Sequence, residues 1–332
     1  MAVTSIGDAA QHFLSMRAGT ALKSDLAQLS ESLSSGRVTD ISRHLRGETA
    51  QFSGLHHKLA QLDGYAQVAR ETGQILDGVQ QALARVDTTR AQLTDQLLLA
   101  KDTRAQVDVA ARAARAGLDT MVSALNMRVA DRSLLGGRDL DTTPLMSADA
   151  MITQVQATLG PDRSFAAITA AISDWFDDPA GGFAAFGYRG DAGGVIQRQI
   201  AEGRQVDIAA RADDPAIRDI LKATVLAAIT VDLPGLAVEV KSDLVQAAGT
   251  QLFGAVSGLA SMQARIGGAQ AQLAEARAET TAQATGLKMA VNDLVSADPL
   301  DTAARLKAVQ LQLETHYTMV GRLSQLSLLR FI

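Results

Sequence analysis

The sequence predicts a mainly α-helical protein, in which the two ends of the chain form a bundle of long helices and a small α+β domain is inserted between them. Alanine supplies 59 of the 332 residues and aromatic residues only 4%, a composition that suits helices packing closely together. None of the six prolines occurs before Pro144, so 143 residues lack the strongest helix breaker. Apolar residues also recur at steps of three and four along both ends of the chain.

The first helix is predicted from apolar residues spaced three or four positions apart, a pattern that ends at the Ser-Gly cluster Ser34-Ser35-Gly36. We expect its apolar residues to form one stripe that a second helix must cover. They fall into two groups, before and after Gly19: Ile6, Ala9, Phe13 and Met16, then Leu22, Leu26, Leu29 and Leu33.

Two further helices follow in the first half of the chain. Apolar spacing holds from Leu55 to Leu97, and a third run extends from Val107 to Leu125, with Gly136-Gly137 as its predicted stop. In the second half, a 3-4 alternation runs from Leu252 through Ala255 and Leu259 to Ala276, and the helical pattern ends at Asp298-Pro299. The last helix carries Leu306, Val309, Leu313, His316, Val320, Leu323, Leu326, Leu328 and Leu329.

The middle of the chain, 136–234, has more glycine, proline and aromatic residues and is predicted to be the inserted domain. Ser147 and Ser164 are placed to cap short helices, and Asp214 is placed to cap another with Pro215 at its first position. Residues 193–210 alternate like two strands, and Glu202-Gly203 is placed to turn a hairpin.

Composition excludes several functional classes. The chain has no cysteine, so disulfides, thiolate metal sites and cysteine nucleophiles are absent. No run approaches about 18 apolar residues, and no signal peptide is visible at the start, so we expect neither a membrane span nor a cleaved leader. The net charge of −5 without a basic block argues against a nucleic-acid surface.

No catalytic or cofactor motif emerges, so we expect no enzyme, no cofactor and no metal. His44 and Glu48 share a helix face but lack a third metal ligand. Asp139 and Asp141 resemble a fragment of a calcium loop whose later ligands are missing. His316 occupies an apolar seam position, where an interface histidine is expected rather than a general base. The glycines between 181 and 194 match neither a phosphate loop nor a dinucleotide fingerprint.

Both ends of the chain resemble a known family. The segment 22–37, a leucine-spaced helix ending in Leu-Ser-Ser-Gly-Arg, resembles the N-terminal signature of flagellins and their junction relatives. The C-terminal segment from Asp298-Pro299 through Tyr317 to 322–329 resembles the ending of the hook-associated protein 3 family, which joins the flagellar hook to the filament. Segments 188–191 and 213–220 are similar to the inserted domain of alphaproteobacterial members. The chain departs from the family at 38–45, where a proline and paired acids are usual.

The resemblance implies a flagellin-like fold and a structural junction adaptor between hook and filament, assembled from many copies in a ring. It implies export through the flagellar secretion channel to an extracellular position, with the chain itself, hook-associated protein 1 and flagellin as partners. The sequence leaves open whether an export chaperone binds the apolar C-terminal helix. The expected layers are 1–40 with 298–332 inside, 41–135 with 235–297 around them, and 136–234 outermost. Two alternatives remain open, a flagellin filament subunit and an intracellular coiled-coil interaction module.

The residues expected to matter are therefore packing residues of the two ends. A loop at Ser34, Ser35, Gly36 and Arg37 is expected, from the resemblance alone, to contact neighbouring subunits. The expected assembly interface consists of Phe13, Leu22, Leu26, Leu29, Leu33, Leu306, Val309, Leu313, Tyr317, Val320, Leu323, Leu326, Leu328 and Leu329.

Overall fold

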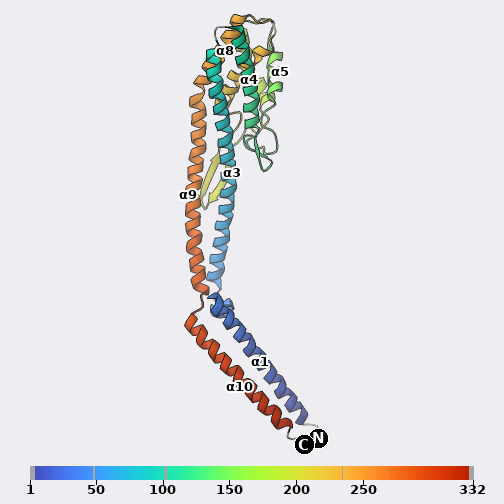
Figure 1. The fold of residues 1–332 in the computed structure, drawn as a ribbon, viewed down its shortest axis with the longest axis vertical. Helices are drawn as coiled ribbons and strands as arrows, with labels where there is room; N and C mark the ends of the chain where they lie inside the picture. The colour runs from blue at the N-terminus through green and yellow to red at the C-terminus, as the bar shows by residue number, and fades with distance from the viewer. Residues whose placement is uncertain (1–3, 48, 101–102, 234, 329–332) are drawn as a thin grey trace. The chain divides into compact units, whose positions relative to one another are not determined.

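The computed structural model describes residues 4–47, 49–100, 103–233 and 235–328, and the chain divides into two compact units. Unit 1 comprises Met1–Asp63 and Thr281–Ile332, and unit 2 comprises 64–280. Long helices dominate and the strands are few and short, which confirms the predicted fold class (Figure 1). The elements in chain order are α1 (Thr4–Ser35), α2 (Ile41–His44), α3 (Ala50–Leu99), α4 (Arg104–Leu125), β1 (Arg128–Val129), β2 (Arg132–Ser133), α5 (Ala148–Thr158), α6 (Phe165–Asp177), η1 (Phe183–Gly187), β3 (Ile196–Ala201), β4 (Arg204–Ile208), α7 (Pro215–Ala228), η2 (Ile229–Val231), α8 (Val238–Gly254), α9 (Val256–Val295) and α10 (Pro299–Leu328).

Unit 1 brings the two ends of the chain together. Helices α1 and α10 pack side by side and antiparallel, so the start of α1 lies beside the end of α10 (Figure 1). The helix α1 ends at Ser35, as the Ser-Gly cluster predicts, and Gly36 follows with a positive φ of 69°. Between α1 and α3, the carboxylate of Asp40 accepts a hydrogen bond from the backbone N–H of Arg43 (2.9 Å) and caps the short helix α2.

The prediction of a single stripe along the first helix is wrong. Helix α1 continues without interruption through Gly19, and at about 100° per residue Phe13 and Met16 then lie on average about 130° around the helix from Leu22 and Leu26. Glycine is tolerated inside a helix although it weakens it, so a lone glycine does not reset the helical phase.

In unit 2, α3 and α9 run antiparallel and bury a continuous seam between them (Figure 1). The side chain of Gln270 donates a hydrogen bond to the Asp77 carboxylate (2.8 Å), and Arg277 donates one to the carbonyl of Ala69. The remaining helices extend this core, with α7 packed on both α4 and α8. Fully buried members of the core include Leu76, Val79, Leu83, Val86, Leu259, Met262 and Ile266.

The inserted segment contains the predicted short helices and hairpin. Ser147, Ser164 and Asp214 each cap a helix by accepting a backbone hydrogen bond, and Pro215 occupies the first turn of α7. Strands β3 and β4 pair antiparallel around the 202–203 turn, where Gly203 has a φ of 69°. These local predictions are confirmed.

The β3–β4 hairpin belongs to the insert by sequence but packs on the long helices of unit 2 (Figure 1). Ile200 on β3 and Val206 and Ile208 on β4 are buried. Arg204 pairs with Glu275 (3.7 Å) and Glu279 (3.3 Å) on α9. The side-chain amide of Gln199 donates to the Tyr65 hydroxyl on α3 (3.4 Å). The hairpin therefore contacts both long helices through polar side chains. The division of the chain into three layers stays a prediction.

Two helix boundaries differ from the predicted ones. Helix α4 ends at Leu125 rather than at Gly136-Gly137. The Asn126 side chain accepts a hydrogen bond from the N–H of Leu145 (2.8 Å) and donates one to its carbonyl (3.0 Å). These two bonds hold the chain in a turn directly after the helix. The run through Leu252 is divided at Ala255, between α8 and α9. There the Leu252 carbonyl accepts a hydrogen bond from the Arg90 guanidinium (3.3 Å), which competes with the helical bond.

Candidate assembly surface of the terminal helices

The inner seam of the α1–α10 pair is only half covered. Residues at helical spacing on each helix face the other, but they are half-buried rather than buried. Because two helices alone cannot enclose a seam, each such side chain keeps part of its apolar surface in contact with solvent. The predicted residues brought together here are Leu22, Leu26 and Leu29 on α1 and Leu306, Val309, Leu313 and Val320 on α10.

Gly19 on α1 is buried and lies against His316 on α10. A Cβ added at Gly19 would lie 3.0 Å from Nε2 of His316, so any larger residue at this position requires the imidazole to shift. One turn further along α1, the Lys23 ammonium lies 5.7 Å from the centre of the Tyr317 ring, in cation–π range. His316 is thus a packing residue of the helix pair, as expected.

Three other predicted residues keep more of their surface exposed than the seam residues do. Phe13 is 68% exposed, Tyr317 is 50% exposed and Leu33 is 38% exposed. Residues Leu323, Leu326 and Leu328 lie within the backbone of α10, but their side chains are outside the described residues, and Leu329 is wholly outside them.

A second apolar stripe runs along the outer face of α10. Leu300, Leu311 and Met319 are 84%, 65% and 61% exposed. With Ala304, Ala308 and Thr315 between them, they follow steps of four, four, three, four and four, and at 100° per residue they lie about 150° around the helix from the inner seam. On α1, Met16 is 61% exposed beside Phe13. The paired ends thus present large apolar side chains outward.

Our sequence reasoning missed this outer stripe, although its signal was present. Leu300, Leu311 and Met319 repeat at helical spacing, but the longer leucine series from 306 to 329 on the same helix predicts a single seam and masks this one. A helix with two apolar stripes on nearly opposite faces is typical of one that packs on two sides.

The predicted contact loop is tied to its own chain. The backbone N–H of Ala297 donates to the carbonyl of Gly36 (2.9 Å), and the N–H of Val38 donates to the carbonyl of Val295 (2.9 Å). Arg37 and Ser296 form the antiparallel bridge between them. The Ser35 hydroxyl accepts from the N–H of Arg37 (3.3 Å), while the Ser34 hydroxyl donates to the carbonyl of Glu31 (3.0 Å). These backbone groups are therefore satisfied within one subunit, and only exposed side chains remain for a neighbour.

The perturbed titratable groups lie in unit 2, and each has a structural cause. Burial raises the pKa of the Tyr188 hydroxyl and, despite nearby Arg211, also that of the Asp213 carboxyl. Burial alone would lower the pKa of Lys222, but its ion pairs with Asp177 (2.8 Å) and Asp219 (3.2 Å) raise it. These groups therefore serve as partners in ion pairs and buried hydrogen bonds.

The rejected metal candidates also have structural explanations where the chain is described. Hydrogen bonds from Thr142 lower the pKa of the partly exposed Asp139 carboxyl, which makes it the acceptor of a local turn. No group of three His, Asp or Glu side chains among the described residues could hold a metal ion. Glu48, the potential partner of His44, lies outside the described residues. Within the described helices, none is long and apolar enough to cross a membrane.

The fold and this surface define a class of protein, a mainly helical structural protein whose paired ends carry outward apolar side chains. Residues 250–332, about a quarter of the chain, match the family model of the bacterial flagellin C-terminal helical region. This region includes α9 and α10. The matching family is structural and non-enzymatic, which confirms the prediction that the chain is not an enzyme.

Comparison with solved structures gives a more distant likeness. A protein from Vibrio parahaemolyticus assigned as a flagellar hook-associated protein aligns with 12% identity and a TM-score of 0.48, over 74% of this chain and 96% of that chain. Agreement of that size carries no functional inference. A comparison with curated proteins found no significant match.

Proposed function

We propose that this chain is a structural protein of the bacterial flagellum that assembles in many copies and connects the hook to the flagellin filament, without catalysis. The observation that carries the proposal is the exposed apolar stripe on α10, which lies within the segment that matches the flagellin C-terminal helical region. In this proposal, the stripe is the surface on which neighbouring subunits pack.

Elementary energetics supports assembly of the paired ends. Fully burying one Leu, Met or Phe side chain stabilises a structure by about 1.5–3 kcal/mol. Phe13, Met16, Leu300, Leu311 and Met319 each expose 61–84% of their surface, so a neighbour that covered them would contribute several kcal/mol per copy. A half-covered two-helix pair gains little from its own seam, since helices without tertiary support are marginal in water. We therefore expect both ends to be largely unfolded in the free monomer and to order when subunits dock.

The proposed arrangement places the terminal segments 1–40 and 298–332 in an inner layer, the long-helix segments 41–135 and 235–297 around them, and 136–234 outermost. The proposed partners are further copies in a ring, hook-associated protein 1 on one side and flagellin on the other. The chain would be exported unfolded through the flagellar secretion channel and act outside the cell. An export chaperone would bind the C-terminal helix.

A filament subunit is the second candidate, because the matching family model is that of flagellin itself. The test is to shear flagella from the source cells and measure the amount of this protein relative to flagellin by quantitative mass spectrometry. A small fixed ratio supports the junction adaptor. Dominance of this protein would make it the filament subunit, and its absence from the flagella would refute both and favour an intracellular coiled-coil module.

A further inference from the structure

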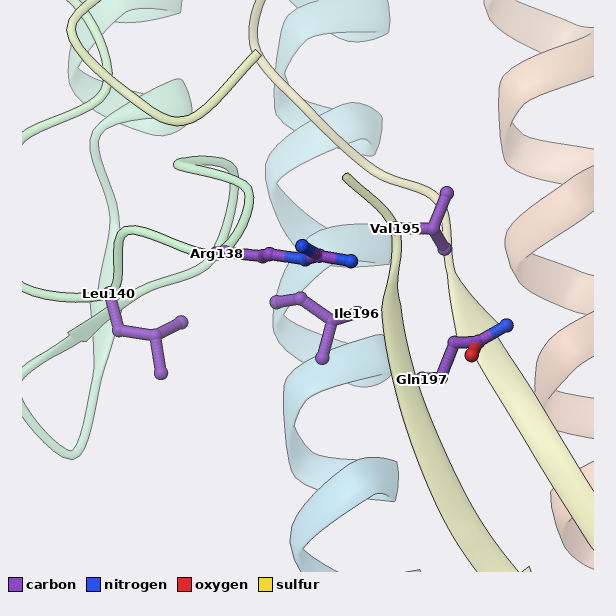
Figure 2. A pocket seen from close by; sticks show the side chains of 5 residues that line it. All are labelled: Arg138, Leu140, Val195, Ile196 and Gln197. Carbon is purple, nitrogen blue, oxygen red and sulfur yellow. The ribbon is translucent and has the colours of Figure 1, made fainter. Parts of the chain in front are cut away.

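The hollow shown in Figure 2 is open to solvent. It lies in unit 2, where the loop that carries Arg138 faces the start of β3. Its lining residues are all exposed or half-buried: Arg138, Leu140, Val195, Ile196 and Gln197. Because none of these side chains is buried, none is fixed firmly enough by packing to select a ligand. In unit 1, by contrast, the two ends of the chain are joined by a well-bonded junction.

The inner seam of the α1–α10 pair has the same spacing on both helices. Read backwards from Leu29, the seam residues of α1 follow steps of three, four, three and four, and those of α10 follow the same steps forwards from Leu306. The helices are antiparallel, so the two series meet (Figure 1). Counted outwards from the contact of Gly19 with His316, the opposed positions are Leu29 and Leu306, Leu26 and Val309, Leu22 and Leu313, and Ser15 and Val320.

This spacing alone does not fix the register of the two helices. A 3-4 pattern repeats every seven residues, so a slide of α10 along α1 by seven residues, about 10 Å, again places seam residues opposite each other. In that shifted register, Leu29 would face Leu313, and His316 would face Leu26 instead of Gly19. Both registers bury leucine against leucine, so a feature outside the seam is needed to select between them.

Two short segments, 36–39 and 295–298, connect the terminal helices to the long helices, and we call them together the strap. The N–H of Ala297 donates a hydrogen bond to the carbonyl of Gly36 (2.9 Å), and the N–H of Val38 donates one to the carbonyl of Val295 (2.9 Å). Val295 is the last residue of α9 and is 1% exposed. The strap is therefore anchored on a buried helix end.

The strap is also bonded to both terminal helices. The hydroxyl of Thr39 donates to the carbonyl of Gln28 (3.1 Å), and the N–H of Thr39 donates to the hydroxyl of Ser32 (3.2 Å), which is buried in the last turns of α1. On the other side, the carboxylate of Asp298 accepts from the N–H of Leu300 (2.8 Å) and caps α10. Each terminal helix is thus held at the end nearest the strap.

The strap holds these two helix ends level with each other. Gly19 lies 16 residues before the end of α1 and His316 lies 17 residues after the start of α10, which correspond to about 24 and 26 Å of helix. The shifted register would offset the helix ends by about 10 Å. Gly36 and Ala297 lie only one and two residues from these ends, so that offset would need fully extended chain and would break the cap at Asp298.

We infer that the strap selects the register of α1 against α10, with Gly36 and Thr39 as its positioning residues. Gly36 has a φ of 69°, which a β-branched residue avoids, and its carbonyl accepts one of the two backbone bonds within the strap. Thr39 supplies the bonds to α1. The consequence for subunit packing rests on the proposed function, because the register decides where Phe13 and Met16 lie relative to the outer stripe of α10.

Cysteine cross-linking measures the register, because the chain has no cysteine of its own. Leu22→Cys with Leu313→Cys joins positions that are opposed in the observed register, whereas Leu29→Cys with Leu313→Cys joins positions that are opposed only in the shifted one. A disulfide needs Cα atoms within about 7 Å, so each pair reports one register. The full chain is oxidised with copper phenanthroline in its free and sedimented fractions, and disulfides within one chain are detected by mass spectrometry. We expect the first pair to cross-link and the second to remain reduced.

The strap variant combines Gly36→Val with Thr39→Val, and its matched control combines Gly47→Val with Thr285→Val. Gly47 also has a positive φ, of 85°, and the Thr285 hydroxyl is bonded within α9, so the control makes the same chemical changes outside the strap. The strap variant should lower the ratio of the first cross-link to the second about tenfold, and the control should leave it unchanged. Thr39→Val alone, which keeps the shape of the side chain, should lower the ratio about threefold.

Equal cross-linking of the two cysteine pairs, or an unchanged ratio in the strap variant, would overturn this role of the strap. Absence of both cross-links from both fractions would overturn it as well, because α1 and α10 would then not be paired. If the double variant fails to fold, Thr39→Val decides. The amount of this protein in sheared flagella is a separate measurement, so the register and the flagellar role can fail independently.

Discussion

The outer stripe of α10 offers the sharpest test of the assembly proposal. The perturbation is the double substitution Leu311→Gln with Met319→Gln, at positions 65% and 61% exposed in the single chain. Leu, Met and Gln have similar helix propensities, so the helix itself should persist. Exposed substitutions of this kind change the free energy of unfolding by no more than about 0.5 kcal/mol. The folded core of unit 2 should therefore be unaffected in the free monomer, whose ends we expect to be largely unfolded.

The effect on assembly should be much larger. Burying the exposed two-thirds of each side chain in a subunit contact is worth about 1–2 kcal/mol, so the pair contributes about 2–4 kcal/mol per copy. At about 1.4 kcal/mol per factor of ten, the critical concentration for assembly should rise by about 30- to 1,000-fold.

Sedimentation of assembled protein at increasing total concentration measures this critical concentration, and mass spectrometry of sheared flagella measures incorporation in cells. Gln310→Ala is the matched control, since Gln310 is exposed on the same helix but lies away from the outer stripe. If the double variant assembles at the same concentration as the unaltered chain, with an unchanged melting temperature, the outer stripe is not a subunit contact.

Four further predictions address other parts of the structure. Leu313→Asp places a charge in the inner seam, so it should abolish assembly and leave the β3–β4 hairpin folded, as measured by sedimentation and amide exchange. Gly19→Leu should destabilise α1–α10 pairing by about 1–3 kcal/mol, because the new side chain overlaps His316, and the loss should appear in amide exchange of the assembled state. Arg204→Gln removes an exposed pair of contacts worth no more than about 1 kcal/mol, so amide exchange should rise in β4 while the melting temperature barely changes. Because the folded-state pKa of Asp139 is lowered, its hydrogen bonds to Thr142 should persist above the ordinary value of 3.8 and be lost as the pH falls through the folded pKa, as followed by NMR titration.

For each of these four predictions, one experimental result would contradict the physical reason given. A motile strain carrying Leu313→Asp would refute the terminal-bundle proposal. Unchanged exchange in Gly19→Leu would show that the helices do not approach at that position. A large fall in the melting temperature of the Arg204→Gln variant would show that the ion pairs of Arg204 with α9 contribute more than an exposed contact does. A pKa of Asp139 at its ordinary value would show that the turn does not depend on the ionised carboxylate.

Local features were predictable from the sequence because their causes lie within a few residues. The caps at Ser147, Ser164 and Asp214 satisfy the first backbone N–H groups of their own helices. The end of α1 at Ser35 and the 202–203 hairpin turn depend on glycines at positive φ. These predictions needed no knowledge of distant contacts.

Errors arose where a distant residue decided the local structure. Helix α4 stops at Leu125 because Asn126 binds the backbone of Leu145, 19 residues away, and the division between α8 and α9 lies where Arg90 binds the Leu252 carbonyl, 162 residues away. Periodicity contains no information about such contacts, since it describes one helix at a time.

The candidate surface shows the same division. Helical spacing identified the leucines of the inner seam, but it did not show that Phe13 and Met16 change face when α1 runs straight through Gly19. The series Leu300, Leu311 and Met319 could have been found from its spacing, but only the exposure of its side chains in the folded chain distinguishes a stripe that packs from one that remains open.

The sequence by itself determined that the chain is built of long helices and that its ends pair. It also determined where the short helices of the insert begin and where its hairpin turns, because composition, capping and periodicity act locally. Only the tertiary structure decided which stripe of α10 is covered by α1 and how the hairpin contacts both α3 and α9. These features depend on contacts between residues far apart in the chain, and such contacts form only when the whole chain packs.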